Sequence, residues 1–431
     1  MTVNRTELDW VISVDDHIIE PPDVWTSRVA SKYKDLAPRI EKGDTECWVY
    51  EGKPHPTWGL TAAAGKDKEE FSPFPITYDE MRPSCYDPKA RIVDMNQDRV
   101  LTQGTFPSFP GLAGQLFYES TDRELGFACV QAYNDFILDE WCAAAPGRFI
   151  PIIIVPLWDP KLAAKEAERC AAKGAKAISF TENPTKVFSG YKNGVGVGAL
   201  PSIHDPSGYW EPLFKTAAEL GMPLCIHIGS SSQMETSSMD APMPVTASCV
   251  RLVSPQKVAI DWLFSGWLQR IPELKIVLSE GGVGWIPALM DICDYHVKQS
   301  FGWASQHGDF DINKGFQADQ RSMIESDIFT PFSIPEQMNP EFLPSQLFRR
   351  NMFGCFLQDE YGAKVVDEVG ADNIMLESDF PHSDSTWPNT LTRAQRVLGG
   401  YSNEIKEKIF RTNAMRVFNF EPADIPQGDD S

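Results

Sequence analysis

A short apolar run followed by a helical segment recurs along most of the chain, and this alternation restricts the possible folds more than any other feature. Apolar runs bounded by turn residues indicate buried strands, and helices between them allow neighbouring strands to lie parallel. We expect strands over 10–14, 100–106, 149–157, 176–180, 223–228, 275–279, 352–356 and 373–378. We expect helices over 117–145, 161–173, 210–220, 255–269, 285–300, 363–369, 390–398 and 403–418. Eight such units predict an α/β fold, a distorted (β/α)8 barrel.

The alternative architecture is an open, doubly wound sheet. That fold normally carries a glycine-rich phosphate loop after its first strand, and the sequence has none there. We therefore expect a single barrel domain over residues 1–420.

Two segments of this domain are too long to be simple connections. They are residues 20–98, after the first strand, and residues 301–350, before the seventh. We interpret both as cap and interaction insertions, and we expect the protein to be a homo- or hetero-oligomer. Residues 421–431 are expected to be a disordered tail.

Composition excludes several classes of protein. The formal net charge of −21 argues against binding to nucleic acid or to an anionic membrane. Hydrophobic residues make up 42% of the chain, which is enough for a large core. The nine cysteines form no CxxC pair, so reduced thiols are expected. With no signal peptide or membrane span visible, the expected location is the cytoplasm.

Three of the seven histidines follow predicted strands. His17 ends the first strand, His227 ends the fifth, and His382 lies three residues beyond Asp379 after the eighth. Asp15 precedes His17 by two residues, so both side chains point to the same side of the strand. The carboxyl ends of barrel strands share one face, which would bring these five residues into one pocket. Such residues predict a divalent metal site, whereas each one alone is more often a core histidine or a capping aspartate.

The same residues carry a resemblance to a known family. The chain resembles the amidohydrolase superfamily, in the branch related to aminocarboxymuconate-semialdehyde decarboxylase. The shared motifs are Asp15-x-His17, His227, the SDFPH run with Asp379 and His382, and the closing TNAMRVF at Thr412 to Phe418. The resemblance implies a distorted barrel with a divalent metal held by Asp15, His17, His227 and Asp379.

One departure from this resemblance concerns the sixth strand. The related decarboxylases usually carry a histidine there for proton transfer, and this chain has Glu280 in VLSEGGVGWIP. Glu20, three residues after His17, is a further carboxylate. The predicted metal-ligating set is Asp15, His17, Glu20, His227, Glu280, Asp379 and His382, with Glu280 and His382 also as catalytic residues.

These ligands exceed what one metal ion requires, and carboxylates suit manganese and iron. We therefore expect two Fe or Mn ions, with zinc as the alternative. Glu20, which precedes two prolines, has an equally plausible structural role, and Glu377 could orient a ligand. Candidate substrate-binding residues are Ser230 and Ser231, beside His227, and His204, in a loop that more often serves structure.

Two enzyme functions on a small-molecule substrate fit these observations. A dinuclear Mn/Fe oxygenase would hydroxylate a small organic molecule, and the surplus of carboxylates favours it. A single-metal hydrolase or non-oxidative decarboxylase is the alternative, and it is the commoner chemistry of the superfamily. We favour the oxygenase over this alternative, and both over a non-catalytic subunit of a hetero-oligomer.

Overall fold

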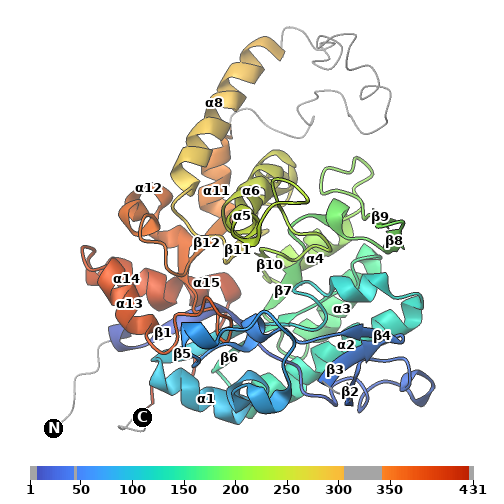
Figure 1. The fold of residues 1–431 in the computed structure, drawn as a ribbon. Helices are drawn as coiled ribbons and strands as arrows, with labels where there is room; N and C mark the ends of the chain where they lie inside the picture. The colour runs from blue at the N-terminus through green and yellow to red at the C-terminus, as the bar shows by residue number, and fades with distance from the viewer. Residues whose placement is uncertain (1–6, 43–45, 305–341, 427–431) are drawn as a thin grey trace, which may run out of the picture.

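Eight parallel strands form the centre of the protein, as the alternating pattern predicted. The computed structural model describes residues 7–42, 46–304 and 342–426 (Figure 1). In sheet order the strands are β1 (Val11–His17), β5 (Val100–Phe106), β6 (Phe149–Ile153), β7 (Ala177–Phe180), β10 (Leu224–His227), β11 (Ile276–Ser279), β12 (Met352–Phe356) and β13 (Ile374–Leu376). Sheet order follows chain order throughout, which is the topology of a (β/α)8 barrel.

The barrel closes between β13 and β1 through the residues that follow β13. The amide of Asp379 donates to the carbonyl of Asp15 at 2.9 Å, and the amide of His17 donates to the carbonyl of Phe380 at 2.6 Å. The seam of the barrel therefore lies beside the predicted metal ligands.

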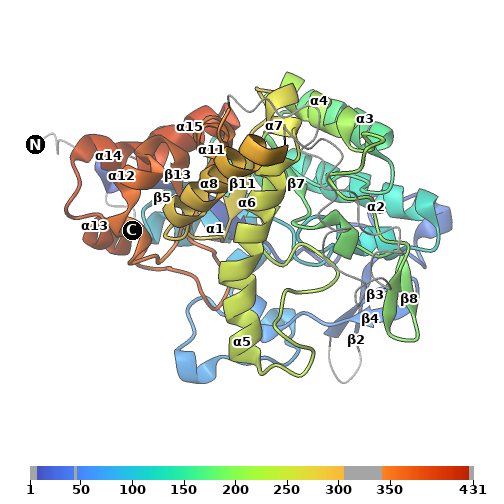
Figure 2. The same ribbon diagram turned by 90° about the horizontal axis from the view of Figure 1, so that it is seen from above.

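Helices surround this barrel (Figures 1 and 2). They are α1 (Pro88–Gln97), α2 (Arg123–Phe136), α3 (Pro160–Ala171), α4 (Glu211–Glu219), α5 (Met243–Ser248), α6 (Ser254–Phe264), α7 (Trp267–Arg270), α8 (Ile286–Ala304), α11 (Pro344–Asn351), α12 (Val366–Val369), α13 (Thr390–Val397), α14 (Asn403–Glu407) and α15 (Asn413–Phe418). The local sequence determines where α3 begins. Asp159 caps the helix by accepting hydrogen bonds from the amides of Lys161 and Leu162, and Pro160 lies in its first turn. None of the helices in the described ranges is long and apolar enough to cross a membrane.

Two predicted elements have different bounds for local reasons. The strand expected over 149–157 ends at Ile153, because the next residue bonds to a side chain instead of a strand. The amide of Ile154 donates to Asn134 Oδ1 at 3.0 Å, and Asn134 Nδ2 donates to the Ile154 carbonyl at 2.9 Å. The helix expected over 403–418 is interrupted by a π-helical turn at Lys408–Thr412.

The insertion after β1 reaches the carboxyl end of the barrel. It contains an antiparallel sheet of β2 (Arg39–Lys42), β3 (Glu46–Tyr50) and β4 (Lys53–His55), followed by short 3-10 turns and α1. The amides of Ala63 and Ala64 both donate to the carbonyl of Pro381 at 2.9 Å. This contact places the insertion against the segment that follows β13.

Other parts of the chain differ from the sequence expectations. Within the second predicted insertion, residues 344–351 form α11, whereas residues 305–341 lie outside the described part of the chain. A hairpin of β8 (Gly190–Lys192) and β9 (Val195–Val197) and the short helix α5 were not predicted. Of the predicted tail, residues 427–431 also lie outside the described ranges.

The amino end of the barrel is filled by the closing motif. Val417 and Phe418 of α15 pack with Ile12, Val277 and Phe353, which come from β1, β11 and β12. The side chain of Asn413 in the same motif donates to the carbonyls of Ala371 and Ile374 at 2.7 and 2.8 Å. The motif that supported the family resemblance is therefore a structural plug at the end away from the metal ligands.

Candidate metal centre

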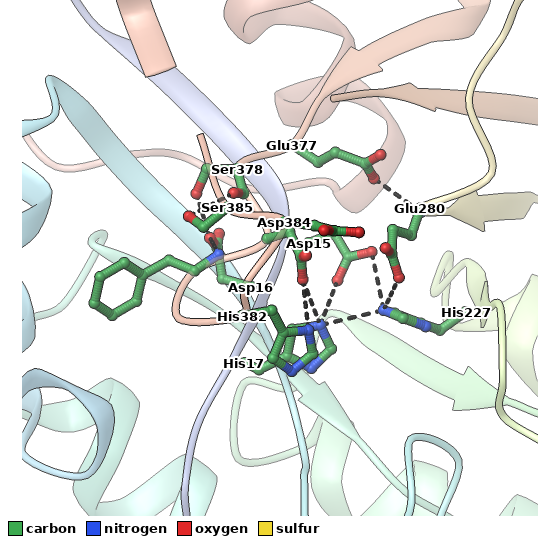
Figure 3. Close-up of polar contacts among 12 residues, drawn as sticks. Asp15, Asp16, His17, His227, Glu280, Glu377, Ser378, His382, Asp384 and Ser385 are labelled. Atoms are coloured by element: carbon green, nitrogen blue, oxygen red, sulfur yellow. Dashed lines mark hydrogen bonds and ion pairs between the residues drawn. The ribbon is translucent and has the colours of Figure 1, made fainter. Parts of the chain in front are cut away.

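The end of β1 presents Asp15 and His17 to one another, as their two-residue spacing predicted. Both side chains are completely buried, and His17 Nε2 lies 3.4 Å from Asp15 Oδ1 (Figure 3). β1 is held in place by parallel pairing with β5, which aligns His17 with Phe106.

Two other strands bring their residues to the same point. His227, the last residue of β10, has its Nε2 3.2 Å from His17 Nε2 and 3.4 Å from Asp15 Oδ2. Asp379, three residues beyond β13, has its Oδ1 3.3 Å from His17 Nε2. Residues more than 300 positions apart in the chain thus meet at the carboxyl end of the barrel, as predicted.

The spacing of these atoms fits a bound cation. Ligand atoms held at about 2.1 Å from one ion lie about 3.0–3.4 Å apart in octahedral or tetrahedral arrangements. The carboxylate oxygens of Asp15 and Asp379 are buried, and their near neighbours in the described structure are the nitrogens of His17, His227 and His382. Buried carboxylates are costly unless a positive charge compensates them. The donor set of two carboxylates and two imidazoles therefore fits a divalent metal ion.

The protonation of the two histidines also fits metal binding. His227 Nδ1 lies 2.6 Å from the carbonyl of Ile228, so this nitrogen carries the proton and Nε2 keeps its lone pair for a ligand. Burial lowers the pKa of His227 to about 4, and burial together with His382 lowers the pKa of His17. Neutral imidazole is the form that binds metals.

His382 lies at the edge of this cluster. Its ring stacks on that of His17 with centroids 3.8 Å apart, and its Nδ1 lies 2.8 Å from Asp379 Oδ1. Burial alone would lower the pKa of His382, but the charge of Asp379 outweighs it and the pKa is raised. Its close contact with a carboxylate makes it either an additional ligand or a group that orients Asp379.

Glu280 faces the cluster from the end of β11. Its Oε2 lies 3.6 Å from His227 Nε2, and its Oε1 accepts a hydrogen bond of 2.6 Å from Arg251 Nη2. Burial and the charge of Asp379 raise the pKa of Glu280 to about 7. Glu377 supports this arrangement, because its Oε2 accepts the backbone amide of Glu280 at 3.0 Å (Figure 3). Glu377 thus orients Glu280, in line with the supporting role considered from the sequence.

A cavity of about 420 Å³ opens beside Glu280. Apolar side chains and the ends of charged ones form its walls: Arg251, Leu252, Glu280, Gly281, Gly282, Gly284, Trp285, Leu357, Gln358, Asp359, Tyr361 and Glu377. Arg251 also pairs with Asp384 at 3.1 Å, so it spans the segments that follow β11 and β13. The cavity has the size of a small-molecule site, with one cation, Arg251, and two acids, Glu280 and Glu377, on the side of the metal cluster.

Four predicted site residues have other partners. The carboxylate oxygens of Glu20 accept the amides of Ser108 and Phe109 at 2.9 and 3.0 Å, so they hold the loop after β5. Ser230 Oγ accepts the amide of Glu182 at 2.8 Å, and Ser231 Oγ donates to the carbonyl of Asn183 at 3.3 Å.

These serines join the loops that follow β7 and β10. His204 is exposed on the outer surface and lies 3.3 Å from Asp261 of α6. Neither Glu20 nor His204 belongs to either group of potential metal ligands found in the described residues.

Two residues of the site were missed by the sequence analysis. Arg251 lies in the π-helical turn Cys249–Val253 that joins α5 to α6, more than 20 residues beyond β10, and no local pattern marks its direction. Asp16 stands between Asp15 and His17, but its side chain points to the opposite side of β1, toward Ser378 (Figure 3). The sequence signal that could have identified it was an acidic residue directly between two predicted metal ligands.

Comparison with known proteins identifies the family and the fold of the chain. The family model described as amidohydrolase matches residues 48–420, a range that contains His227, Glu280 and Asp379. The chain is 24% identical over 313 residues to the gamma-resorcylate decarboxylase of Rhizobium sp. (strain MTP-10005), covering 70% of this chain and 79% of that protein.

Two solved structures resemble the fold closely. An amidohydrolase of Mycobacterium avium subsp. paratuberculosis K-10 aligns with a TM-score of 0.68 at 22% identity, covering 95% of this chain and 99% of that one. The 5-carboxyvanillate decarboxylase of Novosphingobium aromaticivorans DSM 12444, solved with manganese and 4-hydroxy-3-methoxy-5-nitrobenzoic acid, aligns with a TM-score of 0.61 at 17% identity. That alignment covers 96% of this chain and 97% of the decarboxylase.

Proposed function

Since the chain belongs to the amidohydrolase family and is a metal-dependent enzyme of that superfamily, we propose that it catalyses the non-oxidative decarboxylation of a small aromatic acid. The observation that carries this proposal is the pair of Arg251 and Glu280, which faces an apolar cavity beside the buried ligand cluster. The decarboxylase activity of the relatives supports the same reaction. We therefore prefer decarboxylation, the alternative in the sequence analysis, to the oxygenase.

Asp15, His17, His227 and Asp379 are the residues proposed to hold the metal. When bound, a divalent ion such as the manganese of the 5-carboxyvanillate decarboxylase would hold an acidic substrate and draw electron density from it. The four residues supply two neutral imidazoles and two carboxylates. The carboxylates are hard oxygen donors, which suit manganese.

The cavity walls would orient the substrate. Trp285, Leu357 and Tyr361 provide the apolar surface for an aromatic ring. Arg251 Nη2, now bonded to Glu280 at 2.6 Å, would exchange that contact for the carboxylate of the substrate. A ring placed between these groups has its carboxyl-bearing carbon next to Glu280.

Glu280 is the group proposed to move the proton. Its protonated carboxyl would donate a proton to the ring carbon that bears the carboxylate, after which the bond to that carboxylate breaks and CO2 leaves. The electron pair of the broken bond restores the ring, and Glu280 regains a proton from solvent through the cavity. Glu280 thereby takes the proton-transfer role of the histidine that related decarboxylases carry at this position.

A second candidate remains the dinuclear Mn/Fe oxygenase. The observation that favours it is that His17 belongs to two groups of potential ligands in the described residues, one with Asp15 and His227 and one with Asp379 and His382. Glu280 lies beside the first group. An oxygenase of this kind would require two redox-active ions per chain and would consume dioxygen.

The deciding experiment is an anaerobic assay with ortho-hydroxylated aromatic acids, including 2,6-dihydroxybenzoate and 5-carboxyvanillate. Metal-free protein is loaded with Mn²⁺ or Zn²⁺, and CO2 release and the decarboxylated product are quantified. We expect turnover without dioxygen at about one ion per chain. A product that forms only with oxygen uptake, at two ions per chain, would reject the proposal in favour of the oxygenase.

A further inference from the structure

The backbone of Asp379 has an unusual conformation for a residue proposed to bind metal. Its φ angle is +56°, in the left-handed region that residues other than glycine seldom adopt. The direction of its carboxylate depends on this backbone, because Asp379 lies beyond the last hydrogen bonds of β13. Backbone hydrogen bonds across the seam, from the amide of Asp379 to Asp15 and from the amide of His17 to Phe380, hold part of this segment, and a side chain of β1 adds to them.

Asp16 bonds to the residues on both sides of Asp379. A single oxygen, Asp16 Oδ1, accepts the hydroxyl of Ser378 and the backbone amide of Phe380, the latter at 3.0 Å (Figure 3). Asp16 is completely buried and does not belong to either group of potential ligands in the described residues. Its carboxylate therefore spans Asp379 without touching the proposed metal position.

Other buried side chains add contacts around Asp16. The amide of Ser378 donates to Ser13 Oγ at 2.8 Å, so β1 binds Ser378 through the side chains of both Ser13 and Asp16. Arg91, also completely buried, donates to the carbonyl of His17 at 2.6 Å and to Gln103 Oε1 at 3.0 Å. The end of β1 is thus hydrogen-bonded both to the segment around Asp379 and to Arg91.

We propose that Asp16 is a positioning residue that fixes the Asp379 carboxylate for metal binding by accepting hydrogen bonds from Ser378 and Phe380. The two aspartates that begin the Asp-Asp-His run then have separate roles. Asp15 faces the metal, and Asp16, turned the other way by the alternation of the strand, orders the ligand that arrives from the far end of the chain. This inference concerns metal binding alone and does not depend on which reaction the enzyme catalyses.

The test compares Mn²⁺ affinity in Asp16→Ala and Asp16→Asn, measured by titrating metal-free protein and following free Mn²⁺ by electron paramagnetic resonance. Asparagine keeps an acceptor oxygen at the position of Oδ1, whereas alanine removes it. We expect Asp16→Ala to weaken binding about 10- to 100-fold, the usual cost of losing a partner of a metal ligand. Asp16→Asn should restore most of that affinity.

Glu166→Ala is the control. Glu166 is also a buried carboxylate held by hydrogen bonds, because its Oε1 accepts from Asn134 Nδ2 at 2.8 Å and from Arg169 Nη2 at 2.7 Å, but it lies on α3 and belongs to neither group of potential ligands in the described residues. We expect this variant to lower the melting temperature of the metal-free protein without changing Mn²⁺ affinity. Equal loss of affinity in the control, or in Asp16→Asn and Asp16→Ala alike, would overturn the proposal.

Ser378→Ala decides the matter if Asp16→Ala does not fold. It removes only the hydroxyl that bonds to Asp16 and leaves the carboxylate in place. We expect Ser378→Ala to lose less Mn²⁺ affinity than Asp16→Ala, because the bond from the amide of Phe380 to Asp16 remains. Affinity equal to that of the wild type in Ser378→Ala, or in a folded Asp16→Ala, would refute the positioning role.

Discussion

The two ends of the barrel use the same eight strands in opposite ways. At the amino end, Val417 and Phe418 fill the interior with apolar side chains, and the polar group of Asn413 is bonded to two carbonyls. At the carboxyl end, Asp15 and Asp379 are equally buried, yet the near neighbours of their carboxylates within the described ranges are the imidazoles of the proposed site. Burial at the amino end stabilises the fold. Burial at the carboxyl end instead places negative carboxylates where a bound metal cation would stabilise them.

The largest effect is expected where the charged end loses a ligand. His227→Ala should abolish retention of metal, because it removes the imidazole whose Nε2 lies 3.2 Å from that of His17. Metal content after gel filtration measures this by elemental analysis. The same variant should fold without added metal, which circular dichroism checks, and full metal content would contradict the assignment of the ligands.

Glu280→Gln should lower the rate of decarboxylation about 100- to 10,000-fold, the range for loss of a general acid. The amide keeps the shape of the side chain and its contact with Arg251, but it has no acidic proton. Single-turnover measurements with bound Mn²⁺ give the rate directly. A near-normal rate with intact metal content would show that another group supplies the proton, and loss of one of two ions would instead favour the dinuclear oxygenase.

Phe418→Ala tests the other side of the comparison. Its ring is completely buried among strand residues at the amino end, and truncation should lower the free energy of unfolding by about 3–5 kcal/mol. Metal-free protein unfolded in urea measures the loss. Because the plug is remote from the ligands, Mn²⁺ affinity of the folded variant should match the wild type. A large change in affinity would mean that the two ends are not independent.

The difference between the ends also explains what sequence alone could predict. The strands, the barrel and the convergence of Asp15, His17, His227 and Asp379 follow from apolar runs and from the shared face of parallel strands. Residues at strand ends are placed by the fold itself, so their proximity needs no knowledge of the loops.

Residues in the connections could not be placed in this way. Glu20 was predicted as a ligand, but its carboxylate accepts the amides of Ser108 and Phe109, a contact set by how the loop after β5 folds back. Arg251 was missed for the same reason, since the long segment after β10 determines where it points. The structure of such segments depends on packing between distant parts of the chain, which no short pattern encodes.

Arg251→Ala should produce the smallest effect, because the side chain is partly exposed at the mouth of the cavity and does not contact the proposed ligands. Losing a hydrogen bond to a charged group costs about 1.5–3 kcal/mol, so KM for an aromatic acid should rise about 10- to 150-fold. Retention of Mn²⁺ should not change. Arg251→Lys keeps the charge but not the paired donors, and a KM between those of wild type and alanine is expected from it. Loss of metal instead of a change in KM would mean that Arg251 serves the ligand cluster, by holding Glu280, more than it serves the substrate.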